Sequence, residues 1–257
     1  MILAWMSLAL FDVYASPKMS VAAPKSARII GGEPTTIDRY PDMIQIMGVI
    51  LNSRAVLTAA HCTEKAAPIQ RLVRIGTSFI NGTGSLGTFR TRRIILGQNF
   101  PYEFDYDISI MLLKQAMPIT PISQIAKIPR PDYYLPDNAP VWTIGWGMTD
   151  VNDPYSGPEQ LHHVQVYSIN QEDCVEKYLN RVNKKGEPDP AYITDNQLCT
   201  GVWGVGVYHN GVVVGIISWG HYCATEYPGV NVRVSRFSNW IDRYIVVVTK
   251  SYLLLII

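Results

Sequence analysis

Short apolar segments separated by turn-forming residues run through most of the sequence and limit the folds open to it. They are rich in β-branched side chains and too short for ordinary helices. The 17 prolines and 19 glycines supply frequent turns between them. The pattern predicts antiparallel β-strands, the clearest being Met43–Ile50, Ala55–Thr58, Ser109–Leu113, Val141–Ile144, Val164–Tyr167 and Val212–Ile217.

Two segments have the pattern of helices instead. Asn170 is a suitable N-cap for Gln171–Leu179, and Glu172 and Asp173 would lie in the first turn, where the helix dipole favours negative charge. Near the C-terminus, apolar residues recur at steps of three and four and predict a terminal helix: Phe237, Trp240, Ile241, Tyr244, Ile245 and Val248. The expected fold class is therefore all-β with a C-terminal α-helix.

The two ends of the chain carry apolar segments of different kinds. Met1–Phe11 has no charged side chain, and small residues near Ala15 suit a cleavage site, so residues 1–15 are predicted to be a signal peptide. An uncleaved N-terminal tail is the alternative, because no Lys or Arg precedes the apolar run. A cleaved signal implies secretion into an oxidising compartment. The apolar tail, residues 246–257, is shorter than the roughly 20 residues that span a bilayer, so we expect no membrane span.

Charge and cysteine spacing argue against several classes of ligand. The net charge is +1, from 22 basic and 21 acidic residues without a basic run, so no nucleic-acid partner is expected. The four cysteines permit two disulfides in three connectivities, and none has the spacing of a zinc site. His162, His163 and His209 also lack ligand spacing. Asn81-Gly82-Thr83 is a candidate N-glycosylation site.

Three motifs carry candidate chemistry in the first half of the chain. Arg28-Ile29-Ile30-Gly31-Gly32 has the pattern of a zymogen activation site, in which cleavage after Arg28 frees the ammonium of Ile29. His61 follows a predicted strand and precedes Cys62, and histidine is the side chain best suited to act as a general base near neutral pH. Asp107 follows 46 residues later at the head of an apolar strand, where a buried carboxylate needs a partner such as an imidazole N–H. Asp105 is a nearby alternative.

Two tryptophan–glycine motifs lie in the second half, Ile144-Gly145-Trp146-Gly147 and Ile217-Ser218-Trp219-Gly220. The second is typical of a strand whose backbone pairs with an extended peptide. Taken in order with Pro228-Gly229-Val230, the motifs resemble the trypsin/chymotrypsin family of serine proteases over residues 28 to 245.

The resemblance implies two antiparallel β-barrels with a C-terminal α-helix and a site in the cleft between the barrels. Residues 16–28 would form an activation propeptide and residues 29–245 the protease domain. His61 would be the general base and Asp107 its orienting carboxylate. Ser218, with Trp219 and Gly220 on the substrate-binding strand, would hydrogen-bond that carboxylate. The implied activity is peptide-bond hydrolysis, without a cofactor, on protein or peptide substrates after an activating protease has cut the chain.

The sequence departs from the family where the nucleophile should be. The family's Gly-Asp-Ser-Gly-Gly lies between a cysteine like Cys199 and a strand like Val212–Trp219. Here Ser218 follows Cys199 by only 19 residues, and residues 200–209 contain neither serine nor aspartate. A segment between Gly206 and Tyr208 is therefore expected to be missing. In the family this segment carries the nucleophile, the oxyanion-hole donors, the acidic partner of the Ile29 ammonium and the floor of the specificity pocket. All four are therefore expected to be absent.

The cysteines indicate the same gap. Cys174 and Cys199 match a family disulfide, whereas Cys62 and Cys223 match cysteines whose partners are absent, so both are predicted to be unpaired. The missing partner of Cys62 implies a second, shorter deletion between Pro41 and Leu51. Both barrels are therefore expected to be incomplete.

Three hypotheses follow from this departure. The chain is an active endopeptidase that uses another serine; it is a non-catalytic homologue that binds ligands or regulates through the old cleft; or the gaps are splicing or gene-model artefacts in a sequence that encodes an active protease. The chain as written is predicted to be inactive.

Overall fold

The computed structural model describes residues 29–253 except 30, 46, 66, 69–70, 98–104, 150–152, 154–155, 184, 202–205 and 222–226, and describes side chains as far as Ile245. The predicted signal peptide, the propeptide with Arg28, and Cys223 lie outside the described residues. Within the part that is described, no helix is both long and apolar enough to cross a bilayer.

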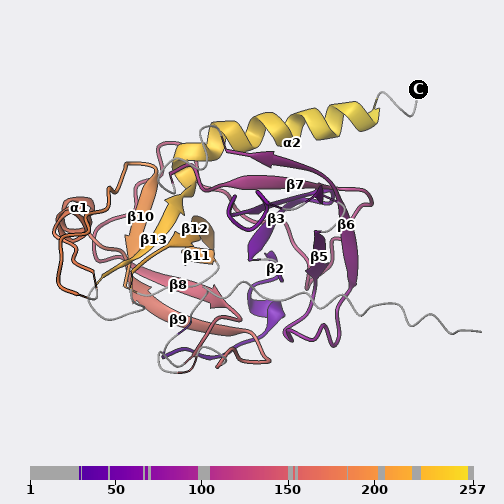
Figure 1. Ribbon diagram of the computed structural model, residues 1–257. Helices are drawn as coiled ribbons and strands as arrows, with labels where there is room; N and C mark the ends of the chain where they lie inside the picture. The colour runs from indigo at the N-terminus through magenta and orange to yellow at the C-terminus, as the bar shows by residue number, and fades with distance from the viewer. Residues whose placement is uncertain are drawn as a thin grey trace, which may run out of the picture.

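The first half of the chain forms a closed barrel (Figure 1) with strand order β2-β3-β4-β7-β6-β5. Its strands are β2 (Met43–Ile44), β3 (Gly48–Asn52), β4 (Ala55–Thr58), β5 (Leu72–Ile75), β6 (Gly87–Leu96) and β7 (Ser109–Leu113). β2 and β5 meet through one residue pair, Ile44 with Ile75, and this pair closes the ring. The expectation that both barrels are incomplete is wrong for this barrel, because a two-residue strand is enough to join its edges.

The predicted strand Met43–Ile50 is two strands with a turn between them. Met47 has a positive φ of 50°, a backbone conformation that ends a strand, and its carbonyl accepts a hydrogen bond from Thr58 Oγ1 at 2.8 Å. At Gly48, β3 and β4 approach so closely that a Cβ would lie 2.0 Å from the Leu57 carbonyl oxygen. The two strands can therefore approach this closely only because glycine has no Cβ.

The second half forms a seven-stranded antiparallel sheet in the order β1-β9-β8-β11-β12-β13-β10. Its strands are β1 (Glu33–Pro34), β8 (Pro140–Gly145), β9 (His162–Tyr167), β10 (Gln197–Thr200), β11 (Gly206–His209), β12 (Val212–Trp219) and β13 (Gly229–Arg233). Beyond β9, Ser168 forms an isolated bridge with Thr200, and the Ile169 N–H donates to the Cys199 carbonyl at 3.0 Å. These contacts connect the end of β9 with the edge strand β10, so the sheet curls into a second barrel. The two strands are joined there by irregular backbone and not by a regular ladder.

Both predicted helices are present. α1 spans Gln171–Leu179, and Asn170 caps it by accepting hydrogen bonds from the N–H groups of Glu172 at 2.8 Å and Asp173 at 3.1 Å. The terminal helix α2 spans Ser238–Leu253 and follows a short 3₁₀ turn, Val234–Phe237. A further 3₁₀ turn of three residues, Ile37–Arg39, precedes β2.

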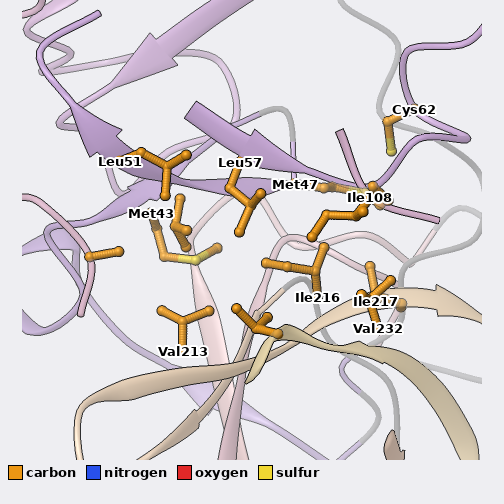
Figure 2. Close-up of a cluster of buried hydrophobic side chains, with 14 of the residues drawn as sticks. Met43, Met47, Leu51, Leu57, Cys62, Ile108, Val213, Ile216, Ile217 and Val232 are labelled. Carbon is orange, nitrogen blue, oxygen red and sulfur yellow. The ribbon is translucent and has the colours of Figure 1, made fainter. Parts of the chain in front are cut away.

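The two barrels share an apolar core. Leu57 and Ile108 of the first barrel belong to the same buried cluster as Ile216 and Val232 of the second. Figure 2 shows these side chains pointing toward one another across the boundary. This packing places the C-terminal end of β4 and the start of β7 against the end of β12, where the candidate active-site residues lie.

Candidate active site

The register between β4 and β7 explains why a histidine and an aspartate 46 residues apart meet. Thr58, the last residue of β4, is paired with Ser109, the first residue of β7. His61 and Asp107 therefore lie just beyond the same edge of the barrel. Asp107 Oδ2 lies 2.7 Å from His61 Nδ1, and Asp107 Oδ1 accepts the His61 backbone N–H at 2.8 Å.

Ser218 joins this pair from the other barrel. Its hydroxyl donates to Asp107 Oδ2 at 2.6 Å from the penultimate residue of β12. Asp107 is fully buried, and burying a carboxylate is tolerated only where donors replace its water. The three donors around Asp107 meet that requirement. Asp105, the alternative aspartate, instead accepts a hydrogen bond from the Asn196 side chain at 3.2 Å.

The surroundings of His61 stabilise its protonated form. Burial lowers the pKa of His61, but hydrogen bonds to Asp107 and Cys62 and the charges of both outweigh it, so the pKa rises from 6.5 to about 10. A general base works best when its pKa lies near the operating pH. The raised pKa means that His61 holds a proton tightly once it has taken one from Cys62, so the ring is poorly suited to serve as the general base for any other group.

The second ring nitrogen of His61 faces a thiol. Cys62 Sγ lies 3.4 Å from His61 Nε2, and Cys62 is a free, buried cysteine, as predicted. Two serines near the site have other partners: Ser109 accepts a hydrogen bond from Thr63 Oγ1, and Ser218 donates to Asp107. The described residues therefore place sulfur, not a serine hydroxyl, next to Nε2.

Ile29, the residue after the predicted cleavage site, already lies inside the protein. Its side chain is fully buried, and its backbone N–H donates to the Met148 carbonyl at 2.7 Å. A Cβ on Gly32 would lie 2.4 Å from Ile29 Cγ2, so the glycine makes room for this side chain. The acceptor that the structure gives this nitrogen is a carbonyl oxygen, which carries no full negative charge.

The end of β12 and the disulfide share one small core. Cys174 and Cys199 are joined, with their Cα atoms 6.4 Å apart, as the resemblance implies. They cluster with Tyr178, on which Trp219 packs edge-on at 4.9 Å between ring centroids. The disulfide thus anchors α1 and β10 beside the predicted substrate-binding residues Ser218, Trp219 and Gly220.

The remaining predicted positions are dispersed. Asn81 is exposed, and its glycosylation stays a prediction. His162 is half-buried and His163 fully buried, as adjacent positions on a strand should be, and His209 bonds to Tyr133 at 2.8 Å. Among the residues described, no group of three or more His, Cys, Asp or Glu side chains is arranged to hold a metal ion.

No sequence pattern pointed to a second buried carboxyl, that of Asp42. It accepts a hydrogen bond from Tyr208 at 3.1 Å, and burial raises its pKa to about 6. Both residues line a cavity of about 470 Å³ whose wall includes Lys127 and Trp142. Asp42 directly precedes β2 and Tyr208 lies in β11, so it is the packing of the two barrels that brings them together.

Comparison with known proteins agrees with this geometry. The Trypsin family model matches residues 29–241. Alkaline trypsin A of Manduca sexta is 39% identical over 241 residues, which cover 83% of this chain and 90% of that protein. Trypsin CFT-1 of Choristoneura fumiferana is 37% identical over 269 residues, covering 93% and 97% of the two chains. The solved structure of an inactivated protease paralogue, S-D1, of the scabies mite has a similar fold, with a TM-score of 0.73 and 23% identity, covering 84% of this chain and 97% of that one.

The sequence of this chain thus matches trypsins over most of its length. The same chain contains the closed barrel, the second antiparallel sheet and the His61–Asp107–Ser218 network. This chain belongs to the trypsin family of serine proteases.

Proposed function

We propose that this protein is by descent a secreted serine endopeptidase, made as a zymogen cut after Arg28, and that the chain as it stands does not turn over peptide substrates. One observation carries the proposal: His61 Nε2, the atom that would activate a nucleophile, faces the Cys62 thiol at 3.4 Å. Protein or peptide substrates are inferred from relatives that are themselves named trypsins.

The chemistry of acyl transfer explains why the loss is large. Removing the nucleophilic serine of such a triad lowers kcat by about 10⁶. Each backbone donor of an oxyanion hole contributes roughly a further 10² to 10³. Residues 200–209 contain no serine or aspartate that could supply the nucleophile or its acidic neighbour.

Cleavage after Arg28 would not complete the site either. The Ile29 nitrogen lies against the Met148 carbonyl, and burying an ammonium without a carboxylate costs several kcal/mol. Full burial of the isoleucine side chain returns only about 1.5–3 kcal/mol. We therefore expect the freed α-amino group to remain in solvent, where an amine-acylating reagent labels it. Protection of that amine after cleavage would contradict this step.

The main test restores the nucleophile. A segment that includes Gly-Asp-Ser-Gly-Gly is inserted at Gly206, the first residue of β11, and the matched control carries Gly-Asp-Ala-Gly-Gly. After cleavage at Arg28, we expect a fluorophosphonate probe to label the serine insertion variant alone. Labelling of the unmodified chain at any serine would overturn the proposal. Sequencing the transcript across Gly206–Val207 and Met47–Gly48 shows whether the gaps are encoded.

A non-catalytic binding role is the second candidate, and the intact end of β12 favours it. The disulfide-anchored cluster holds Trp219 beside Tyr178, next to Gly220, without any contribution from the absent segment. An extended peptide pairing with this strand needs backbone groups rather than a nucleophile. A small protein inhibitor of trypsin, immobilised on a sensor surface, tests this role. Binding that is lost in Trp219→Ala supports it, and no binding by the unmodified chain refutes it.

A further inference from the structure

Among the residues that the structure describes, Cys62 is the one nucleophilic side chain in contact with the imidazole. Its Sγ lies 3.4 Å from His61 Nε2, while His61 Nδ1 lies 2.7 Å from Asp107 Oδ2. Ser218 donates to the same carboxylate oxygen at 2.6 Å. A nucleophile within reach of a base that a third group orients is the general arrangement of an activated nucleophile.

The turn after β4 holds the thiol and the ring on the same side. The Ala60 carbonyl accepts the N–H groups of both Thr63 and Glu64 at 2.8 Å, so the chain folds back immediately after His61. The His61 backbone N–H is itself held by Asp107 at 2.8 Å. The contact between sulfur and imidazole is thus supported by the backbone as well as by the side chains.

We propose that Cys62 is a thiol activated by His61, and that it reacts with small, uncharged disulfides to form a mixed disulfide. This inference does not depend on whether the cleft binds peptides. It requires only the free cysteine, the imidazole and the carboxylate that orients the ring.

The exchange balances without a further reactant. The proton of the Cys62 thiol passes to His61 Nε2, and the sulfur attacks one sulfur of the disulfide R–S–S–R. The original S–S bond breaks as the Cys62–S–S–R bond forms. The departing thiolate takes the proton from the imidazolium and leaves as R–SH. Cys62 is oxidised, and the released half of the disulfide is reduced.

Burial limits the reagent to small and uncharged molecules. Cys62 is only 4% exposed, whereas the His61 side chain beside it is 21% exposed. Figure 2 places Cys62 at the margin of the shared apolar cluster, past Met47 and Ile108. A reagent must therefore enter beside the imidazole and along apolar side chains, a path that disfavours charged molecules.

The modification would also change the imidazole. The thiol group is one of the features that raise the pKa of His61. Converting it to a neutral mixed disulfide removes that contribution. The histidine of the modified protein should therefore titrate at a lower pH than that of the free protein.

The test uses the full chain with Cys223→Ser, so that Cys62 is the one cysteine outside the Cys174–Cys199 disulfide. The folded protein is treated with 2-hydroxyethyl disulfide, quenched at intervals and weighed by intact-mass spectrometry. We expect one adduct, absent when Cys62→Ser is added, and much slower modification by the charged disulfide of glutathione. His61→Asn should slow the reaction at pH 7 by about tenfold or more and steepen its dependence on pH.

His209→Asn is the matched control, because it removes a histidine that bonds to Tyr133 and leaves Cys62 in place. It should react like the parent protein. If circular dichroism shows that His61→Asn does not fold, Asp107→Asn, which keeps the imidazole but not its orienting charge, gives the same test. An unchanged rate and pH profile in the folded variant would overturn the proposal. So would failure of the folded parent to react under conditions in which the urea-unfolded chain does.

Discussion

The protonated His61 side chain contributes to stability in a strongly pH-dependent way, and replacing Asp107 with asparagine should make that contribution weak. Asp107→Asn keeps the shape of the side chain but removes the charge that His61 meets at 2.7 Å. Because the folded pKa of His61 is raised, its contribution to stability is fully present below the unfolded value of 6.5. That contribution is lost progressively as the pH rises through about 10.

The magnitude follows from the shift. A rise from 6.5 to about 10, at 1.36 kcal/mol for each pH unit, corresponds to about 5 kcal/mol favouring the protonated ring in the folded protein. Asp107 and Cys62 share this effect, and the carboxylate hydrogen bond is the larger favourable cause. At pH 6 we therefore expect Asp107→Asn to lower the free energy of unfolding by about 3 kcal/mol, the lower end of the cost of breaking a buried ion pair.

Urea unfolding of the parent and variant at unit pH intervals from 6 to 10 measures the effect. The difference in unfolding free energy should be largest at pH 6 and should shrink steadily toward pH 10. A proton NMR titration of His61 should show its midpoint falling in the variant. The reasoning is refuted if the stability difference stays constant across the range, since the histidine would then not be coupled to the carboxylate.

Three further predictions test other parts of the fold. Asp42→Asn should stabilise the protein at pH 7 by up to about 3 kcal/mol, because burial raises the pKa of Asp42 from 3.8 to about 6. The penalty for ionising the buried carboxyl builds up between these two pKa values and is absent well below the lower one, so the variant should have little effect at pH 3. Urea unfolding at pH 3 and 7 checks this, and destabilisation at pH 7 would contradict it. Asn170→Ala should lower stability by about 1 kcal/mol through loss of the helix cap, whereas Asn170→Asp, which keeps an acceptor, should not. Gly48→Ala places a Cβ 2.0 Å from the Leu57 carbonyl and should cost about 1–3 kcal/mol or more, seen as a lower thermal midpoint; an unchanged midpoint would show that β3 shifts freely.

Local chemistry made the helices and the clearest strands predictable. The cap at Asn170 depends on residues no more than three positions away, so the predicted range Gln171–Leu179 is correct. Ala55–Thr58 and Ser109–Leu113 are likewise found with their predicted bounds, because short apolar runs next to turn residues leave few alternatives. The resemblance identified the disulfide, which spacing alone could not, since four cysteines allow three connectivities.

Features that depend on distant contacts were not predictable. β6, Gly87–Leu96, contains three arginines and has a largely exposed face, so its sequence lacks a continuous apolar run. The closure of the first barrel depends on a single pair between Ile44 and Ile75, which no local pattern indicates. The contact between Asp42 and Tyr208 joins residues 166 positions apart. The proximity of Cys62 to His61 Nε2 depends on side-chain orientation, which the adjacent positions alone do not determine.

The apolar core shared by the barrels has a consequence for cooperativity. Leu57 and Ile108 lose their packing if the second barrel opens, and Ile216 and Val232 lose theirs if the first one does. Neither half can therefore melt while the other keeps its native surroundings, and the chain should unfold in a single transition. A fragment that ends between β7 and β8 would expose this face to water and should associate with its missing half or aggregate, instead of folding as an independent domain.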